Sequence, residues 1–193
     1  MPKRILIIDG HPGKGTFSTS LAQAYAKGAQ TEGHEVRWLV LRELQFDPIL
    51  HEGYSQIQPL EPDLQRAQAD ITWAQHVVWV FPNWWMGPPA LLKGFVDRTL
   101  LPGFAFKYHT KDPFWDRLLA GRSARMVNTY DAPIPYNWFM YRSEGQLAFR
   151  VGVLKFSGFK PVKTTAIGEV KNMKEADCNK WIAKLEALGR TGT

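Results

Sequence analysis

A loop rich in glycine and hydroxyl side chains follows the first apolar segment of the chain. It covers residues 9–18, with the sequence DGHPGKGTFS. Glycine lets backbone N–H groups approach a ligand closely. Thr16 and Ser18 lie where a helix is expected to begin, and free N–H groups and the helix dipole favour a phosphate there. His11 and Lys14 add hydrogen-bond donors or positive charge. The loop therefore predicts an anion site, although Thr16 by itself fits an ordinary helix N-cap equally well.

Two common nucleotide-binding patterns do not fit this loop. A Walker loop requires G-x-x-x-x-G-K-[ST], but Gly15 is followed by Thr16 and Phe17. A dinucleotide fingerprint requires G-x-G-x-x-G, and the position of its third glycine is occupied here by Ser18. The anion predicted for this loop is therefore not held in either of these two ways.

A second unusual loop contains two adjacent tryptophans. Residues 81–89 read FPNWWMGPP and follow an apolar segment. The indoles of Trp84 and Trp85 could form a wall for a planar heterocycle, with the backbone N–H groups of Asn83 to Trp85 bonded to its edge and the prolines holding them in place. The same tryptophans could instead fill the core or a dimer interface. The residue types alone leave both interpretations open.

Strand-like and helical segments alternate along the whole chain. The expected strands are residues 4–8, 35–41, 76–81, 124–129 and 162–167. The expected helices are residues 16–32, 64–75, 89–99, 144–156 and 174–188. This alternation predicts an α/β fold, with a doubly wound five-stranded parallel sheet and helices on both faces, in a single domain over residues 1–193. Because ligands of such sheets bind at the carboxyl ends of the strands, the loops after the first, third and fourth strands are expected to form the site.

Composition narrows the class of protein. The 193 residues are 45% hydrophobic, which fits one globular domain. No apolar run approaches the ~18 residues of a membrane span, and the first residues lack a secretory signal, so we expect a cytoplasmic protein. Cys178 is the only cysteine, which leaves no internal disulfide and no metal-ligand spacing. The net charge of +6 is scattered along the chain and indicates general surface charge rather than nucleic-acid binding.

The tryptophan loop is also the start of a longer motif. Residues 81–98, FPNWWMGPPALLKGFVDR, closely resemble the core motif of the NAD(P)H:quinone oxidoreductases with a flavodoxin-like fold, and residues 102–106, PGFAF, continue it. The first-loop pattern of that family, a histidine, a short spacer and Ser/Thr-Phe-Asn/Ser, is matched by His11 and residues 16–18. The resemblance extends over nearly the whole chain, including residues 154–159, LKFSGF.

The resemblance implies a flavin site built from three loops. The first loop would surround the flavin phosphate or ribityl chain, and the third would line the isoalloxazine ring. The fourth loop, residues 128–133, departs from the Thr-Thr-Gly-Gly of many relatives and is similar to a bacterial subgroup with Thr-x-Asp-x-Pro. The implied flavin-binding residues are His11, Thr16, Phe17, Ser18, Pro82, Asn83, Trp84, Trp85, Met86, Thr129, Tyr130 and Asp131.

Two further residues are candidates for a catalytic role. Tyr136 stands where relatives have an active-site tyrosine, while the histidine that accompanies it in the family has no counterpart here. Arg142 stands at a comparable offset. The resemblance thus implies Tyr136 and Arg142 as catalytic candidates, with no metal ion required.

The resemblance implies a two-electron, ping-pong reaction. NAD(P)H would pass a hydride to flavin N5 and leave, and a quinone or similar acceptor would then bind at the same face. FMN is the expected flavin, with FAD as the alternative. A homodimer is expected, with residues 104–115 as a candidate contact. One alternative is a flavodoxin-like electron carrier, which the positive charge disfavours because such carriers are usually acidic. Another is a regulatory subunit on a potassium-efflux transporter, associated with the membrane from outside it.

Overall fold

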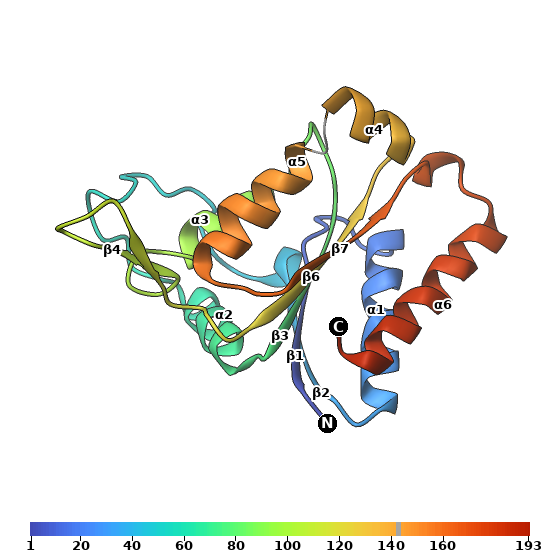
Figure 1. Ribbon diagram of the computed structural model, residues 1–193, viewed down its shortest axis with the longest axis horizontal. Coiled ribbons are helices and arrows are strands. Elements are labelled where there is room, and N and C mark those ends of the chain that lie inside the picture. Colours follow the sequence, from blue (N-terminus) through green and yellow to red (C-terminus); the bar gives the residue numbers. More distant parts are fainter. Residues whose placement is uncertain (142–143) are drawn as a thin grey trace.

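Five parallel strands form the central sheet of the computed structural model, which describes residues 1–141 and 144–193. The strand order is β2-β1-β3-β6-β7 (Figure 1). The strands are β1 (Arg4–Asp9), β2 (Glu35–Val40), β3 (His76–Pro82), β6 (Ser123–Thr129) and β7 (Val162–Ile167). The order changes direction between β1 and β3, which places the topological switch point there. The predicted doubly wound parallel sheet is therefore confirmed.

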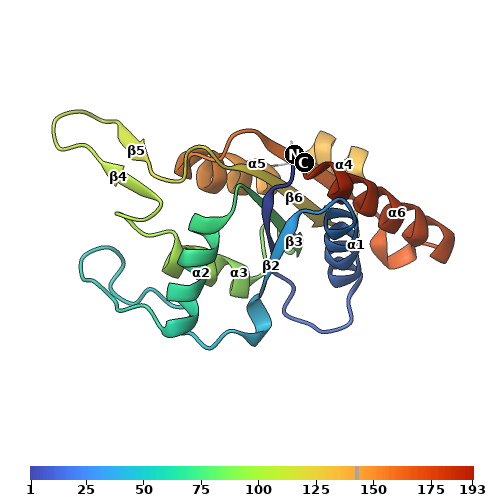
Figure 2. The same ribbon diagram turned by 90° about the horizontal axis from the view of Figure 1, so that it is seen from below.

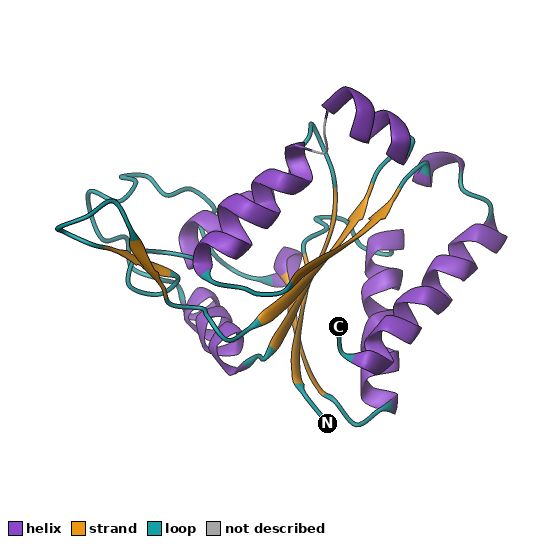
Figure 3. Cartoon of the chain, viewed as in Figure 1, coloured by secondary structure: helices purple, strands orange, loops and turns teal. Residues whose placement is uncertain are grey.

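Helices cover both faces of the sheet and make three layers (Figure 3). One face is covered by α1 (Phe17–Thr31) and α6 (Glu175–Thr191), which lie side by side in Figures 1 and 2. The other face is covered by α2 (Pro62–Trp73), α3 (Ala90–Thr99), and α5 (Glu144–Leu147) with its continuation η2 (Ala148–Lys155). Each face has its own apolar core, because the central strands are buried on both sides. Two short 3₁₀ turns are also present, η1 (Leu41–Glu43) and η3 (Val170–Asn172).

Three elements differ from the expectation. An antiparallel hairpin of β4 (Phe106–Tyr108) and β5 (Trp115–Arg117) projects from one side of the molecule (Figure 1). The fourth loop continues into a helix, α4 (Ile134–Tyr141), with a proline in its first turn, where the missing N–H costs no hydrogen bond. The helix expected over residues 144–156 is present, but its η2 part has π-helical geometry.

No helix in the described ranges is both long enough and apolar enough to cross a membrane.

Candidate functional site

The first, third and fourth loops meet at the carboxyl edge of the sheet. The rings of His11 and Trp84 lie 5.7 Å apart, edge to face, and join the first loop to the third. Ser18 Oγ lies 3.3 Å from Thr129 Oγ1 and joins the first loop to the fourth. The N–H of Asn83 donates to the carbonyl of Thr129 at 2.8 Å. Residues that are distant in sequence are thus brought together at the topological switch point, where ligands of this architecture bind.

A buried ion pair supports the first loop from below. The Asp9 carboxylate accepts hydrogen bonds from Arg42 Nη1 at 2.7 Å, from Thr19 Oγ1 at 2.9 Å and from the N–H of His11 at 3.1 Å. The side chain of Asp9 is 1% exposed and that of Arg42 is 12% exposed. The pair fixes where β1 ends and where the loop begins. Sequence reasoning assigned no role to Arg42, because nothing local to that residue indicates its partner.

His11 offers a hydrogen-bond donor to the site and no positive charge. Its Nδ1 accepts the N–H of Gly13 at 2.8 Å, so in a neutral ring the proton lies on Nε2. Burial lowers the pKa of His11 below its usual value, and Arg42 lowers it further, against an opposing effect of Asp9. The ring is therefore neutral at physiological pH, and of the two contributions expected from His11 the structure favours the donor.

The start of α1 has a structural explanation of its own. Thr16 is the N-cap, and its Oγ1 accepts the N–H of Thr19 at 3.3 Å. Phe17 packs against the apolar core beneath α1. The simpler interpretation of Thr16 is therefore the one that the structure shows. The first N–H groups of a helix have no intrahelical partner, so the start of α1 remains suited to an anion.

The tryptophan loop is a tight turn with unusual backbone angles. Trp84 and Gly87 exchange backbone hydrogen bonds of 2.8 and 2.9 Å. Between them, Trp85 has φ 49° and Met86 has φ 62°, the left-handed conformation at both central positions of a type I′ turn. Such angles cost on the order of 1–3 kcal/mol per non-glycine residue and occur most often at ligand sites. The turn therefore stores strain directly beside the meeting point of the three loops.

This turn changes which backbone donors face a ligand. The N–H groups of Asn83 and Trp84, expected to bond to a ring edge, donate instead to the carbonyls of Thr129 and Gly87. Within the described ranges, the N–H groups of Trp85 and Met86 have no acceptor from the protein. The expectation that these amides bond to the edge of a planar ligand is therefore wrong for Asn83 and Trp84, and for Trp85 it stays a prediction.

The tryptophans themselves do not fill the core. Trp85 is fully exposed and Trp84 is about half exposed, while Pro82, at the end of β3, is buried. An interior plug is therefore excluded for both indoles. A wall for a planar ligand and a surface for a second protein chain remain, and the two are compatible because a partner could cover the outer side of the same turn.

Gly145 is a site residue that sequence reasoning missed. It lies in the first turn of α5, directly against the tryptophan turn: a Cβ built on Gly145 would be 1.7 Å from the carbonyl oxygen of Met86 and 3.2 Å from Asn83 Oδ1. Only glycine permits this approach. The available signal was a glycine inside a predicted helix, where it usually weakens the helix and needs a packing reason.

Gly145→Ala is expected to displace the tryptophan turn and to reduce turnover about 100-fold, because a shift of about 1 Å in a positioning element has this effect. Steady-state turnover and ligand affinity measure it. Gly152→Ala, in η2, is the matched control, since a Cβ there meets nothing within 4 Å. Equal activities of the two variants would show that α5 does not hold the turn in place.

The fourth loop contributes buried and exposed groups in turn. Tyr130 is buried, and its N–H donates to Ile167 O at 2.8 Å. Asp131 is exposed. Asn128, at the end of β6, is 1% exposed, and its Oδ1 has no hydrogen-bond partner among the residues described. Asn128 is therefore an additional candidate acceptor for a ligand, absent from the residues predicted by sequence.

The two catalytic candidates are only partly placed by the structure. Tyr136 lies on α4 with its side chain about half exposed. Arg142 lies outside the described residues. The pair therefore stays a prediction, and only its tyrosine has a defined position.

The chain belongs to the flavodoxin-like fold family, whose family model matches residues 3–188. An uncharacterized NAD(P)H oxidoreductase of Haemophilus influenzae is 30% identical over 196 residues, covering 95% of this chain and 96% of that protein. NAD(P)H dehydrogenase [quinone] 1 of Rattus norvegicus is 25% identical, covering 82% of this chain and 66% of its own length. Among solved structures, an FMN-dependent NADH-azoreductase of Bacillus anthracis, in complex with FMN, superposes with a TM-score of 0.76 at 15% identity, covering 99% of this chain and 100% of that one. This last similarity establishes the shared fold.

Proposed function

We propose that the protein is a flavin-dependent oxidoreductase that takes two electrons from NADH or NADPH and passes them to a quinone or a similar acceptor. The observation that carries the proposal is the meeting of three loops at the switch point, where the contact between His11 and Trp84 joins a helix start suited to an anion to an exposed aromatic turn. The names of the Haemophilus and rat relatives support the same chemistry.

The residues at this edge fit a flavin. The Nε2–H of His11 and the start of α1 suit its phosphate. The unpaired N–H groups of Trp85 and Met86 suit acceptors on the ring edge, and the unpaired Oδ1 of Asn128 suits a ring N–H. A bound flavin would supply the two-electron chemistry, while the protein supplies binding and orientation. We propose FMN, which the azoreductase of the same fold binds, with FAD as the alternative.

The protein's own groups have separate tasks in this proposal. His11, held neutral by burial, donates a hydrogen bond to phosphate without adding charge. The strained turn presents the N–H groups of Trp85 and Met86, which would bind the ring edge, and the two indoles, which would form its wall. Tyr136 and Arg142 stay the candidates for donors that stabilise negative charge in the reaction.

The test begins with the colour of the purified protein. Flavin released by heat should have the mass of FMN, and the protein should oxidise NADH or NADPH only when a quinone is supplied. Trp85→Ala should weaken flavin binding about fivefold or more, since an aromatic wall contributes on the order of 1 kcal/mol or more. Trp38→Ala, a change at an exposed tryptophan on β2, should not. Protein that takes up neither FMN nor FAD would contradict the proposal, and flavin-loaded protein without turnover would favour the electron carrier.

The catalytic candidates have their own readout within this assay. Tyr136→Phe and Arg142→Ala are each expected to slow flavin reduction or reoxidation in stopped-flow experiments. Flavin affinity in both variants should stay close to that of the parent protein. Unchanged rates in both variants would remove these two residues from the mechanism.

We also propose a homodimer that covers the tryptophan turn. Large exposed apolar side chains occur on α4 and on the helix of α5 and η2 that follows it, and isolated soluble proteins rarely expose so many together. These side chains are Trp138, Phe139, Met140, Leu147 and Val151. The contact expected from sequence, residues 104–115, lies on the projecting hairpin and exposes Tyr108 and Phe114.

Two matched variants distinguish the two candidate surfaces. Phe139→Glu on α4 is expected to give a monomer in light-scattering measurements, because a charge would be buried in the interface. Phe114→Glu on the hairpin should leave the dimer intact. The reverse result would assign the contact to the hairpin, and a monomeric parent protein would contradict the dimer.

A further inference from the structure

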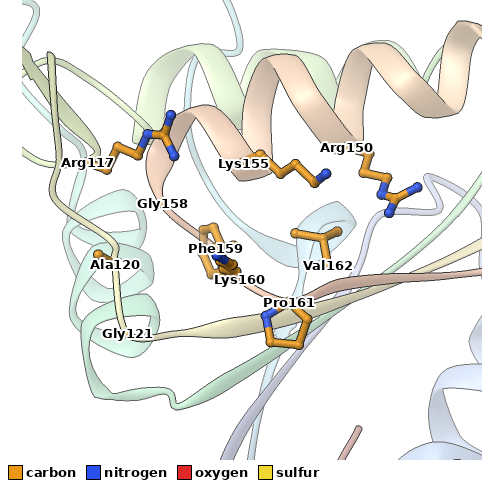
Figure 4. Close-up of a pocket in the computed structure, with 10 residues that line it drawn as sticks. All are labelled: Arg117, Ala120, Gly121, Arg150, Lys155, Gly158, Phe159, Lys160, Pro161 and Val162. Carbon is orange, nitrogen blue, oxygen red and sulfur yellow. The ribbon is translucent and has the colours of Figure 1, made fainter. Parts of the chain in front are cut away.

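A cavity of about 720 Å³ lies at the opposite edge of the sheet from the candidate site. It opens between η2 and residues 158–162, next to the amino ends of β6 and β7 (Figure 4). Thr129, in the candidate site, is at the other end of β6. At about 3.3 Å per residue the length of this strand separates the two places by about 20 Å. The cavity is therefore a different place from the site proposed for the flavin.

Among the described residues, four cationic side chains and no carboxylate line this cavity: Arg117, Arg150, Lys155 and Lys160. In the part of the chain that the structure describes, none of the four forms an ion pair. The Nε of Arg150 is buried and has no acceptor from any residue that the structure describes. A buried polar group without a partner costs free energy, and four like charges around one space repel one another. An anion in the cavity would relieve both effects.

The π-helical geometry of η2 brings two of these cations to the same side. Arg150 and Lys155 are five residues apart. In an α-helix of 3.6 residues per turn such a pair would point about 140° apart. In a π-helix the backbone hydrogen bond joins residues five apart, as the N–H of Phe156 does with Val151 O here, so side chains at this spacing lie closer to one side of the helix than in an α-helix. Figure 4 shows both side chains reaching from the helix over the same space, with Arg117 at its end.

We propose that this cavity, the cationic cavity, binds a small soluble anion that carries at least two phosphate groups. Arginine and lysine are the side chains that bind phosphate in proteins. The volume of the cavity falls within the range of about 300–1,000 Å³ for small-molecule sites. A single phosphate would fill only part of it. π-Helical segments are rare and occur frequently at functional sites. The inference depends only on these residues and stands independently of the flavin chemistry.

Calorimetric titration of the purified protein with inorganic pyrophosphate tests the proposal. One equivalent should bind, and orthophosphate should bind more weakly. Arg150→Gln and Lys155→Gln should each weaken binding about tenfold, the effect of losing one charge-assisted hydrogen bond. Lys180→Gln removes the same charge from exposed α6, on the other face, and should leave the affinity unchanged.

Three outcomes would overturn the proposal. These are no binding at millimolar pyrophosphate, an equal weakening of binding by Lys180→Gln, or an affinity that is unchanged in both Arg150→Gln and Lys155→Gln. Binding that vanishes when the protein is saturated with FMN would also overturn it, because the anion would then occupy the flavin site. Lys155 and Lys160 are exposed, so glutamine at either position keeps the test available if Arg150→Gln fails to fold.

Discussion

Replacement of Arg42 by methionine is expected to lower the free energy of unfolding by about 3–5 kcal/mol at neutral pH. The change would leave the Asp9 carboxylate, 1% exposed, with two neutral donors and without its cation at 2.7 Å. An uncompensated buried charge is the costly result of breaking such a pair. The first loop should lose its position at the same time, because His11 donates its N–H to the same carboxylate. Urea unfolding and FMN titration measure the two effects.

A double variant separates the charge from the packing. Arg42→Met combined with Asp9→Asn removes both charges, keeps the acceptor for His11, and should recover part of the lost stability. Lys93→Met breaks the exposed pair with Asp97, which is equally short at 2.6 Å, and should cost less than about 1 kcal/mol. If Arg42→Met costs no more than Lys93→Met, the buried pair does not support the loop.

The central sheet could be predicted because its signals are local. The two central strands β1 and β3 are short, almost wholly apolar runs, and the residues that end them are glycine, proline or polar groups within a few positions. The expected first strand, residues 4–8, needed only Asp9 added, and the fifth, residues 162–167, has the observed bounds. Burial on both faces makes such runs apolar throughout. The strand order then follows from the right-handed crossover rule with few alternatives.

The elements that differ from the expectation, the hairpin, α4 and η2, have a different cause in common. Their structure depends on contacts with residues distant in sequence. The hairpin of β4 and β5 has strands of only three residues and shows no clear alternation. α4 is apolar almost all round, and Pro135 with the preceding Pro133 suggests a loop in isolation. The π-helical register of η2 has no known one-letter pattern, because it differs from an α-helix by the hydrogen-bond step and not by composition.

The candidate site also has a part that the sequence predicts and a part that it does not. The loop sequences identified the first and third loops, and their meeting followed from the topology. The sequence did not predict which backbone N–H groups of these loops remain without a hydrogen-bond partner. The turn at Trp85 and Met86 engages the amide of Trp84, which depends on φ angles that non-glycine residues seldom adopt, and the carbonyl of Thr129 engages the amide of Asn83. Arg42 and Gly145 act on loops far from them in sequence, so no local pattern points to either role.

The second large effect concerns acid stability and comes from His76. This residue begins β3, is 1% exposed, and lies 2.7 Å from Ser123 Oγ through Nδ1. Its Nε2 is buried without a hydrogen-bond partner among the described residues. Burial, with smaller contributions from the charges of Lys3 and Arg125, lowers the pKa of His76 to about 3. The folded protein therefore holds this ring neutral over a pH range in which the unfolded chain binds a proton.

The sign of the effect follows from this difference. Between pH 6.5 and about 3 the unfolded state carries one more proton at His76, so the free energy of unfolding falls as the pH falls, by up to about 1.4 kcal/mol per pH unit. The contribution is about 2 kcal/mol between pH 6.5 and 5, and about 5 kcal/mol over the whole range as an upper bound. Above pH 6.5 both states hold a neutral ring and the effect vanishes.

Urea unfolding at pH 7 and pH 5 tests this contribution. His76→Phe keeps a ring between Tyr25 and Ser123, whose hydroxyl can still donate to Gln75 O. Its loss of stability between the two pH values should be about 2 kcal/mol smaller than that of the parent protein. His109→Gln provides a control of opposite sign, because Asp116 and Asp112 raise the pKa of His109, so its removal should make the loss on acidification slightly larger. The same pH dependence in His76→Phe and the parent protein would show that water or a rearranged partner reaches this histidine in the folded state.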